Sequence, residues 1–158
     1  MKISLRKTND SDITKIEQWI KDIEAYKYMS RFYPRAFDRK IEDIGIYLWF
    51  VIVVDDLDVG TIWVEKENVD AEVATLGIFI GVKDKFGYGI GEAAIKEVIN
   101  ISKKEWKLKT INLNVRKNNQ RAIKCYERCG FFVNGEGTKL NDDGQSIEFI
   151  KMKYDYID

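Results

Sequence analysis

The chain has 158 residues, of which 45% are hydrophobic and 33% charged, and its 26 basic residues are balanced by 26 acidic ones. This length is typical of one domain with a real core, so we expect residues 1–158 to form a single domain. Balanced charge provides no general attraction to nucleic acid or to anionic membranes, and we expect neither as a partner. Because the N-terminus lacks the apolar core of a signal peptide and no apolar run approaches the ~20 residues of a membrane span, a cytoplasmic protein is predicted.

Histidine is absent, and the only cysteines are Cys125 and Cys129. Without histidine, the chain cannot form a Ser-His-Asp or Cys-His triad or a histidine-ligated metal site. The two cysteines lie one helical turn apart, which suits neither a disulfide nor a complete zinc site, so we expect buried thiols and no metal. Any chemistry must therefore use carboxylates, tyrosines, amines or main-chain groups.

The first elements in chain order are a strand and two helices. KISLRK, residues 2–7, alternates apolar and polar side chains, which indicates a half-buried strand. Apolar residues then recur at helical spacing over residues 13–23, and Asp10 or Ser11 is expected to cap this helix. A second helix is predicted over residues 38–47.

Three strands and a long helix come next. WFVIVV (residues 49–54) and TIWVE (residues 61–65) flank a turn-like segment, which predicts a hairpin. The nearly unbroken apolar run of residues 74–81 indicates a strand that is covered on both faces. Residues 89–106 then show the apolar spacing of an amphipathic helix.

The C-terminal part predicts a strand, a helix and two more strands. TINLNV, residues 110–115, is the strand, and the helix over residues 119–130 ends at Gly130. The last strands are expected over residues 131–136 and 146–154. This order predicts an α/β fold with a mixed, mostly antiparallel central sheet of about seven strands, flanked by about four helices.

Gly87, Gly89 and Gly91 alternate with Tyr88 and Ile90 where the long helix begins. Unpaired amides and the macrodipole make a helix start a binding site for phosphate or pyrophosphate. The P-loop motif does not fit, because it requires Lys and Ser/Thr after the last glycine, where Glu92 and Ala93 stand. The dinucleotide motif does not fit either, because it requires a glycine or alanine where Glu92 stands and belongs in the first strand-helix unit. The alternative is that the glycines only allow a helix and a strand to pack closely, and a glutamate at position 92 would repel a phosphate unless it turns away.

The stretch FGYGIGEAAIKEVI resembles the Gln/Arg-x-x-Gly-x-Gly/Ala cofactor loop of the GNAT superfamily of N-acetyltransferases, with Gly89 and Gly91 in its two small positions. Phe86 stands where many members have Gln or Arg. With an aromatic residue at this position, the chain resembles the branch of the superfamily that contains ribosomal-protein N-terminal and spermidine acetyltransferases.

A second signature lies about thirty residues further along the chain. NQRAIKCYERCGFF resembles the family's Asn-x-x-Ala-x-x-x-Tyr-x-x-x-Gly-Phe and matches it at Asn119, Ala122, Tyr126, Gly130 and Phe131. Two motifs in this order are far more specific than either alone. The resemblance implies the acyl-CoA N-acyltransferase fold, acetyl-CoA as the donor, and a primary amine as the acceptor: a small polyamine, an aminoglycoside-like amine or a peptide N-terminus.

The resemblance also implies which residues hold the cofactor. Main-chain groups of Phe79, Ile80 and Gly81 would bind the pantetheine arm like an extra strand. The pyrophosphate would be held by the loop residues Phe86, Gly87, Tyr88, Gly89, Ile90, Gly91 and Glu92. Asn119 would bind near the thiol end of the cofactor, with the Tyr126 hydroxyl facing the sulfur.

The catalytic candidates are Tyr126 and a base. A phenol is a weaker acid than a thiol, so Tyr126 is expected to donate a hydrogen bond to the leaving thiolate. Glu72 is the candidate base, and water relayed through Asn114 is its rival. The alternative without a catalytic role is that Glu72 is only an exposed turn residue. For Tyr126 the corresponding alternative is a tyrosine that packs in the core.

The aromatic segment before the first hairpin is the candidate acceptor site. Tyr28, Phe32 and Tyr33 would form its wall together with Asn114, although ordinary core aromatics are an equally open interpretation. Asp70 and Glu72 would attract a cationic acceptor. The rival functions are a non-catalytic acyl-CoA-binding or regulatory domain and a dimerisation module that pairs its C-terminal strands, and a homodimer is possible in either case.

Overall fold

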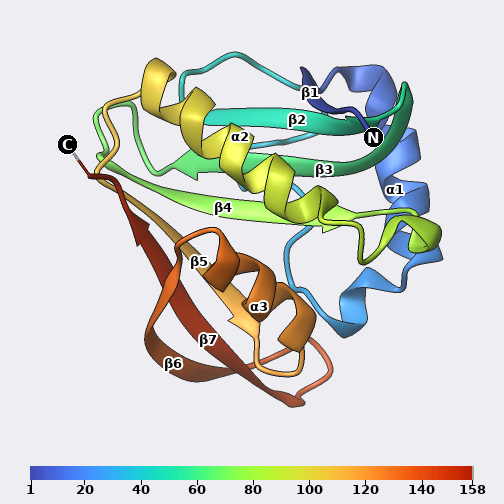
Figure 1. Ribbon diagram of the computed structural model, residues 1–158. Coiled ribbons are helices and arrows are strands. Elements are labelled where there is room, and N and C mark those ends of the chain that lie inside the picture. The colour runs from blue at the N-terminus through green and yellow to red at the C-terminus, as the bar shows by residue number, and fades with distance from the viewer. Residues whose placement is uncertain (158) are drawn as a thin grey trace.

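A seven-stranded sheet forms the centre of the computed structural model, which describes residues 1–157 (Figure 1). Its strand order is β1-β2-β3-β4-β5-β7-β6, and every neighbouring pair is antiparallel except β4 with β5. The strands are β1 (Ile3–Lys7), β2 (Tyr47–Val54), β3 (Leu57–Lys66), β4 (Val73–Ile80), β5 (Thr110–Arg116), β6 (Phe132–Leu140) and β7 (Ser146–Asp155). The predicted mixed, mostly antiparallel sheet is confirmed.

Three α-helices flank this sheet within the described residues. They are α1 (Ile13–Asp22), α2 (Ile90–Glu105) and α3 (Gln120–Arg128), and short 3-10 turns occur at Asp10–Asp12, Ala25–Lys27 and Lys83–Lys85. None of the helices within residues 1–157 combines the length and the apolar character that a membrane crossing requires. The cytoplasmic location stays a prediction.

The two faces of the sheet bury two separate cores. Successive side chains of a strand point to opposite faces, so Ile52 and Ile62 pack with α2 and α3 while Trp49 and Trp63 pack with Trp19 of α1. Figure 1 shows α2 and α3 lying across the same face of the sheet. The apolar run of β4 is therefore covered on both sides, as predicted.

The helix predicted over residues 38–47 does not form, so the expected four helices are three. Arg39 and Gly45 have positive φ angles of 66° and 73°, which a right-handed helix excludes. Two amides of the segment bind side chains instead: Ile41 donates to Asp10 Oδ1 at 2.9 Å and Glu42 to the Tyr47 hydroxyl at 2.9 Å. These tertiary hydrogen bonds replace the helical ones.

The predicted cap of α1 by Asp10 or Ser11 does not form, because Asp12 is the N-cap residue of α1 and its side chain makes no capping hydrogen bond there. Asn9 caps the 3-10 turn Asp10–Asp12 that precedes α1: its side chain accepts from the Ser11 amide, and the Asp12 carboxylate accepts from the Asn9 amide at 2.9 Å to complete a capping box. Arg6 of β1 donates to both oxygens of Asp12 at 2.9 and 2.8 Å. This contact fixes the start of α1 against the edge of the sheet.

We expect Asp12→Asn to lower the free energy of unfolding at pH 7 by about 2 kcal/mol, because it weakens a cap and a charge-assisted hydrogen bond. Burial by itself would raise the pKa of Asp12, but hydrogen bonds from Arg6 and Asn9 outweigh it and lower that pKa below its usual value. The stabilisation is therefore complete above the unfolded value near pH 4 and is lost as the pH falls through the lower folded value.

Urea unfolding at pH 7 and at pH 3 checks this expectation. The difference between the wild type and Asp12→Asn should shrink at the lower pH. The matched control is Asp142→Asn, which changes an exposed carboxylate of the β6–β7 turn and should leave the curves unchanged. A difference that stays constant with pH would mean that the charge of Asp12 is irrelevant to stability.

Candidate active site

The parallel strands β4 and β5 part beside the glycine stretch, residues 87–91. They pair only where Val73–Thr75 faces Thr110–Asn112, yet β4 continues to Ile80 and β5 to Arg116 (Figure 1). A cavity of about 820 Å³ lies here, lined by the two diverging strands, the glycine stretch, α3 and the loop after α1. Its volume suits a large ligand.

The free edge of β4 offers main-chain groups to this cavity. The Gly81 amide donates to the Val59 carbonyl at 2.7 Å, so the main chain of Gly81 faces β3. Along an antiparallel pair, the main-chain N–H and C=O groups of successive residues point alternately toward and away from the partner strand. The main-chain groups of Phe79 therefore also face β3, whereas those of Ile78 and Ile80 face the gap toward β5. Of the three predicted pantetheine contacts, only Ile80 keeps its main-chain groups available, and Ile78 joins it.

The glycine stretch leaves open space above its main chain. Gly87 and Gly89 have φ angles of 84° and 76°, and a Cβ at either would meet nothing within 4 Å. A Cβ at Gly91 would meet only the Cys125 sulfur, at 3.5 Å. Close packing is therefore not the reason for these glycines, in contrast to Gly81, where a Cβ would lie 2.1 Å from Trp19.

Charged side chains surround the start of α2, which begins at Ile90. The Glu92 carboxylate is engaged by Arg128 at 3.2 Å and by Lys96 at 3.9 Å, so its charge is partly neutralised. The guanidinium of Arg121 lies 4.2 Å from the centroid of the Phe86 ring. This contact brings a cation from α3 to Phe86, in the loop that the motif resemblance implies as the cofactor site.

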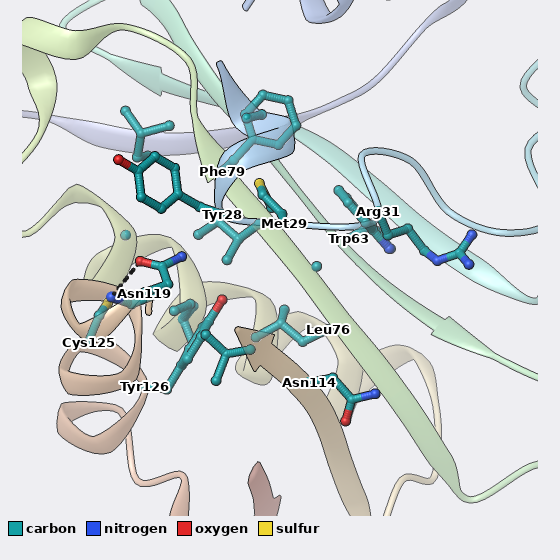
Figure 2. A pocket seen from close by; sticks show the side chains of 18 of the residues that line it. Tyr28, Met29, Arg31, Trp63, Leu76, Phe79, Asn114, Asn119, Cys125 and Tyr126 are labelled. Atoms are coloured by element: carbon teal, nitrogen blue, oxygen red, sulfur yellow. Dashed lines mark hydrogen bonds between the residues drawn. The ribbon is translucent and has the colours of Figure 1, made fainter. Parts of the chain in front are cut away.

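Tyr126 and Asn119 line the cavity from α3 (Figure 2). Asn119 caps this helix by accepting from the Ala122 amide at 3.4 Å. Burial raises the pKa of Tyr126 well above its usual value, and the nearby thiols of Cys125 and Cys129 raise that pKa further. At neutral pH the Tyr126 hydroxyl is therefore protonated and can donate a hydrogen bond into the cavity.

The two cysteines differ in their surroundings. Cys129 is buried, as expected, but Cys125 is only half-buried and lines the cavity. Both thiols are free. The prediction of two buried thiols is therefore right for one and wrong for the other, because α3 turns the face that carries Cys125 toward the cavity.

The predicted acceptor residues separate into two groups. Tyr28 and Asn114 line the cavity. Phe32 and Tyr33 do not line it; they pack in the core beneath α1, where Tyr33 meets Trp49 with its ring centroid at 6.1 Å. The core interpretation is correct for these two aromatics.

Four other predicted residues also lie outside the cavity lining, one of them Gly81 of the predicted pantetheine contacts. Glu72 is exposed at the start of β4 and pairs with Lys109 at 2.9 Å, so it is not positioned to act as the base. Tyr88 is 63% exposed to solvent. Asp70 does not line the cavity either, so the acidic pair expected to attract a cationic acceptor is absent from it.

Sequence reasoning missed the cationic residues that line the cavity, among them Arg31, Arg35, Arg116 and Lys139 at one end of it. Arg116 holds the loop after α1 in place, because its Nη1 donates to the Tyr26 carbonyl at 2.8 Å and its Nη2 to the Met29 carbonyl at 3.1 Å. The only signal in the sequence was the pair of arginines in RFYPRAF, whose aromatic residues drew the interpretation instead.

Comparison with known proteins identifies the class of this fold and site. Residues 2–132 match the family described as the acetyltransferase (GNAT) domain, so the chain belongs to that family of acetyltransferases. The family predicted from the two motifs is thereby confirmed.

Named relatives and solved structures are similar to the chain along most of its length. A peptidyl-lysine N-acetyltransferase, YjaB, of Salmonella typhimurium is 23% identical over 98% of this chain and 99% of its own. A spermine/spermidine N(1)-acetyltransferase of Bacillus subtilis is 26% identical over 80% of this chain and 71% of its own. The crystal structure of spermidine N-acetyltransferase from Vibrio cholerae in complex with CoA and spermine has the same fold, with a TM-score of 0.80, 21% identity, and coverage of 96% of this chain and 94% of that one.

Proposed function

We propose that the protein transfers the acetyl group of acetyl-CoA to a primary amine in a ternary complex. The observation that carries this proposal is the parting of β4 and β5 directly beside the open glycine stretch. An extended pantetheine arm fits the free strand edge, and a pyrophosphate fits the unpaired amides at the start of α2. Both parts of one cofactor would thus lie in a single cavity.

Particular residues would hold the cofactor. The amides of Ile90, Gly91 and Glu92 belong to the first turn of α2 and have no acceptor within the helix. Arg121 would add a positive charge beside them, a role that the Phe86 contact supports. Asn119 would bind the cofactor near its thiol end, because it lines the same cavity.

The reaction would be aminolysis of the thioester. The nitrogen of the neutral amine attacks the acetyl carbon, the C–N bond forms, the C–S bond breaks, and its electron pair leaves with sulfur. The nitrogen loses one proton, so the products are an amide and free CoA thiol. Tyr126 would stabilise the growing negative charge on sulfur by hydrogen bonding.

The amine must lose its proton before it attacks, because an alkylamine with a pKa near 10.4 is mostly charged at pH 7. We propose that water in contact with Asn114 and main-chain carbonyls carries this proton away, in place of Glu72. Asn114 lines the cavity, but its amide side chain cannot itself accept the proton.

We also propose that residues 1–158 form one acetyltransferase domain, because β6 and β7 complete the same sheet that the matched residues begin. The non-catalytic alternative is not favoured, since the family is one of acetyltransferases. Homodimer formation stays a prediction.

Calorimetric titration with acetyl-CoA tests the cofactor, with ATP and NADH as controls. We expect saturable binding of acetyl-CoA alone, followed by release of CoA thiol when a suitable primary amine is added. Absence of acetyl-CoA binding would overturn the proposal. Binding without thiol release from any amine would favour the non-catalytic alternative.

A further inference from the structure

Four cationic side chains meet at one end of the cavity, and we call them the cationic cluster: Arg31, Arg35, Arg116 and Lys139. They come from the loop after α1, from the end of β5 and from β6. Figure 2 shows Arg31 on the opposite side of Tyr126 from Cys125 and Asn119, which lie toward the glycine stretch. The cluster therefore lies at the end of the cavity away from the proposed phosphate site.

No carboxylate within residues 1–157 forms an ion pair with any member of the cationic cluster. Glu65 also lines this end, but its two oxygens accept from the amides of Arg35 and Ala36 at 2.6 and 2.8 Å. Glu67 is exposed at the cavity rim. Two carboxylates thus oppose four cations at this end of the cavity, and Glu65 keeps its charge while it accepts from the two amides.

Another cation at this end is directed elsewhere. The Lys66 ammonium donates to the Val69 carbonyl at 2.7 Å and lies 4.4 Å from the centroid of the Trp106 ring. It therefore adds to the positive potential without itself being available to a ligand.

Arg116 is partly hydrogen-bonded, to the Tyr26 and Met29 carbonyls and the Ser30 hydroxyl, but the positive charges of the cationic cluster lie close to one another. Burial and then repulsion by Arg116, Arg31 and Arg35 lower the pKa of Lys139. Burial followed by repulsion from Arg35 lowers the pKa of Arg31, against the opposing attraction of Glu65. The Arg116 Nε is buried and has no hydrogen-bond partner among the described residues. An anion would relieve the repulsion and accept hydrogen bonds from guanidinium groups.

We propose that the acceptor is a primary amine that also carries an anionic group, a carboxylate or a phosphate, which the cationic cluster binds while the amine faces Tyr126. This inference rests on the proposed acetyltransferase function. A polycation such as spermine would be repelled by the same residues, so this site favours a different acceptor from the spermine and spermidine in the names of two of the similar proteins.

Matched amines of one chain length test this proposal: γ-aminobutyrate, its uncharged amide, and putrescine. Binding to the protein saturated with CoA is measured by calorimetry or ligand-detected NMR, and acetylation by thiol release. We expect γ-aminobutyrate to bind about tenfold more tightly than the amide, and putrescine more weakly than either, because like charges in contact are costly. Phosphoethanolamine, compared with ethanolamine, shows whether phosphate or carboxylate is preferred.

Charge reversal provides the second arm. The double variant Arg31→Glu/Lys139→Glu should reverse the order, so that putrescine binds better than γ-aminobutyrate. Its matched control is Lys40→Glu/Lys107→Glu, which makes the same change in net charge at exposed residues outside the cavity and should keep the wild-type order.

Each outcome separates the inference from the proposed function. Acetylation that prefers putrescine, or an order that charge reversal does not alter, would overturn the anionic acceptor and leave the acetyltransferase standing. Failure of acetyl-CoA to bind would remove the proposed function. In that case, the same three amines titrated into the free protein still measure the preference of the cationic cluster, and equal binding would overturn it.

Discussion

Tyr126→Phe should lower kcat by about a hundredfold while the dissociation constant for acetyl-CoA changes little, because removal of one donor to a developing anion typically costs this much. The substitution removes a single oxygen from a residue that lines the cavity on α3. The ring remains, so its contact with Phe131 at a centroid distance of 5.9 Å and the fold are retained. Steady-state thiol release and calorimetry with acetyl-CoA measure the two quantities separately.

The control is Tyr26→Phe, which removes the hydroxyl of an exposed tyrosine outside the cavity lining and should leave kcat unchanged. The raised pKa of Tyr126 adds a second expectation. Since the hydroxyl stays protonated, ionisation of Tyr126 should not affect the rate below pH 10. The pH-rate profiles of the wild type and Tyr126→Phe should therefore have the same shape over that range. An unchanged kcat would remove Tyr126 from the mechanism.

Gly91→Val should weaken acetyl-CoA binding by roughly thirtyfold, equivalent to about 2 kcal/mol, the loss of two amide–phosphate hydrogen bonds. Gly91 is the second residue of α2, and the space above it is open apart from the Cys125 sulfur. The two γ-methyl groups of valine extend beyond the Cβ position into the space where a phosphate would approach the amides.

Gly91→Ala is the matched control, because its Cβ makes only an ordinary contact with Cys125 at 3.5 Å and alanine favours a helix. We expect it to bind acetyl-CoA within a few-fold of the wild type and to unfold at the same or a higher temperature. Calorimetry and thermal unfolding of both variants distinguish lost binding from lost structure. If valine leaves the affinity intact, the pyrophosphate does not contact the start of α2.

The sequence alone determined the sheet, the helices that pack on it, and the two motifs of the site. Apolar periodicity is a local property, so it predicted all seven strands and the three α-helices that formed. The glycine stretch and the segment around Asn119 and Tyr126 were recognisable because their chemistry depends on residues close together in the chain.

Only the tertiary structure decided the features that depend on distant residues. The segment 38–47 has helical spacing, but hydrogen bonds from its amides to Asp10 and Tyr47 exclude the helix. Glu72 was a plausible base by its position in the chain, yet the cavity opens farther along β4, where β5 has moved away. A linear sequence does not show where two strands part.

The cationic cluster illustrates the same limit. Its members are spread from Arg31 to Lys139, and the balanced total of 26 basic and 26 acidic residues conceals them. Electrostatic potential depends on distance through space, and folding brings these four charges together while leaving Asp70 and Glu72 outside the cavity. The class of chemistry was thus encoded in local motifs, whereas the charge of the preferred acceptor became apparent only from the folded chain.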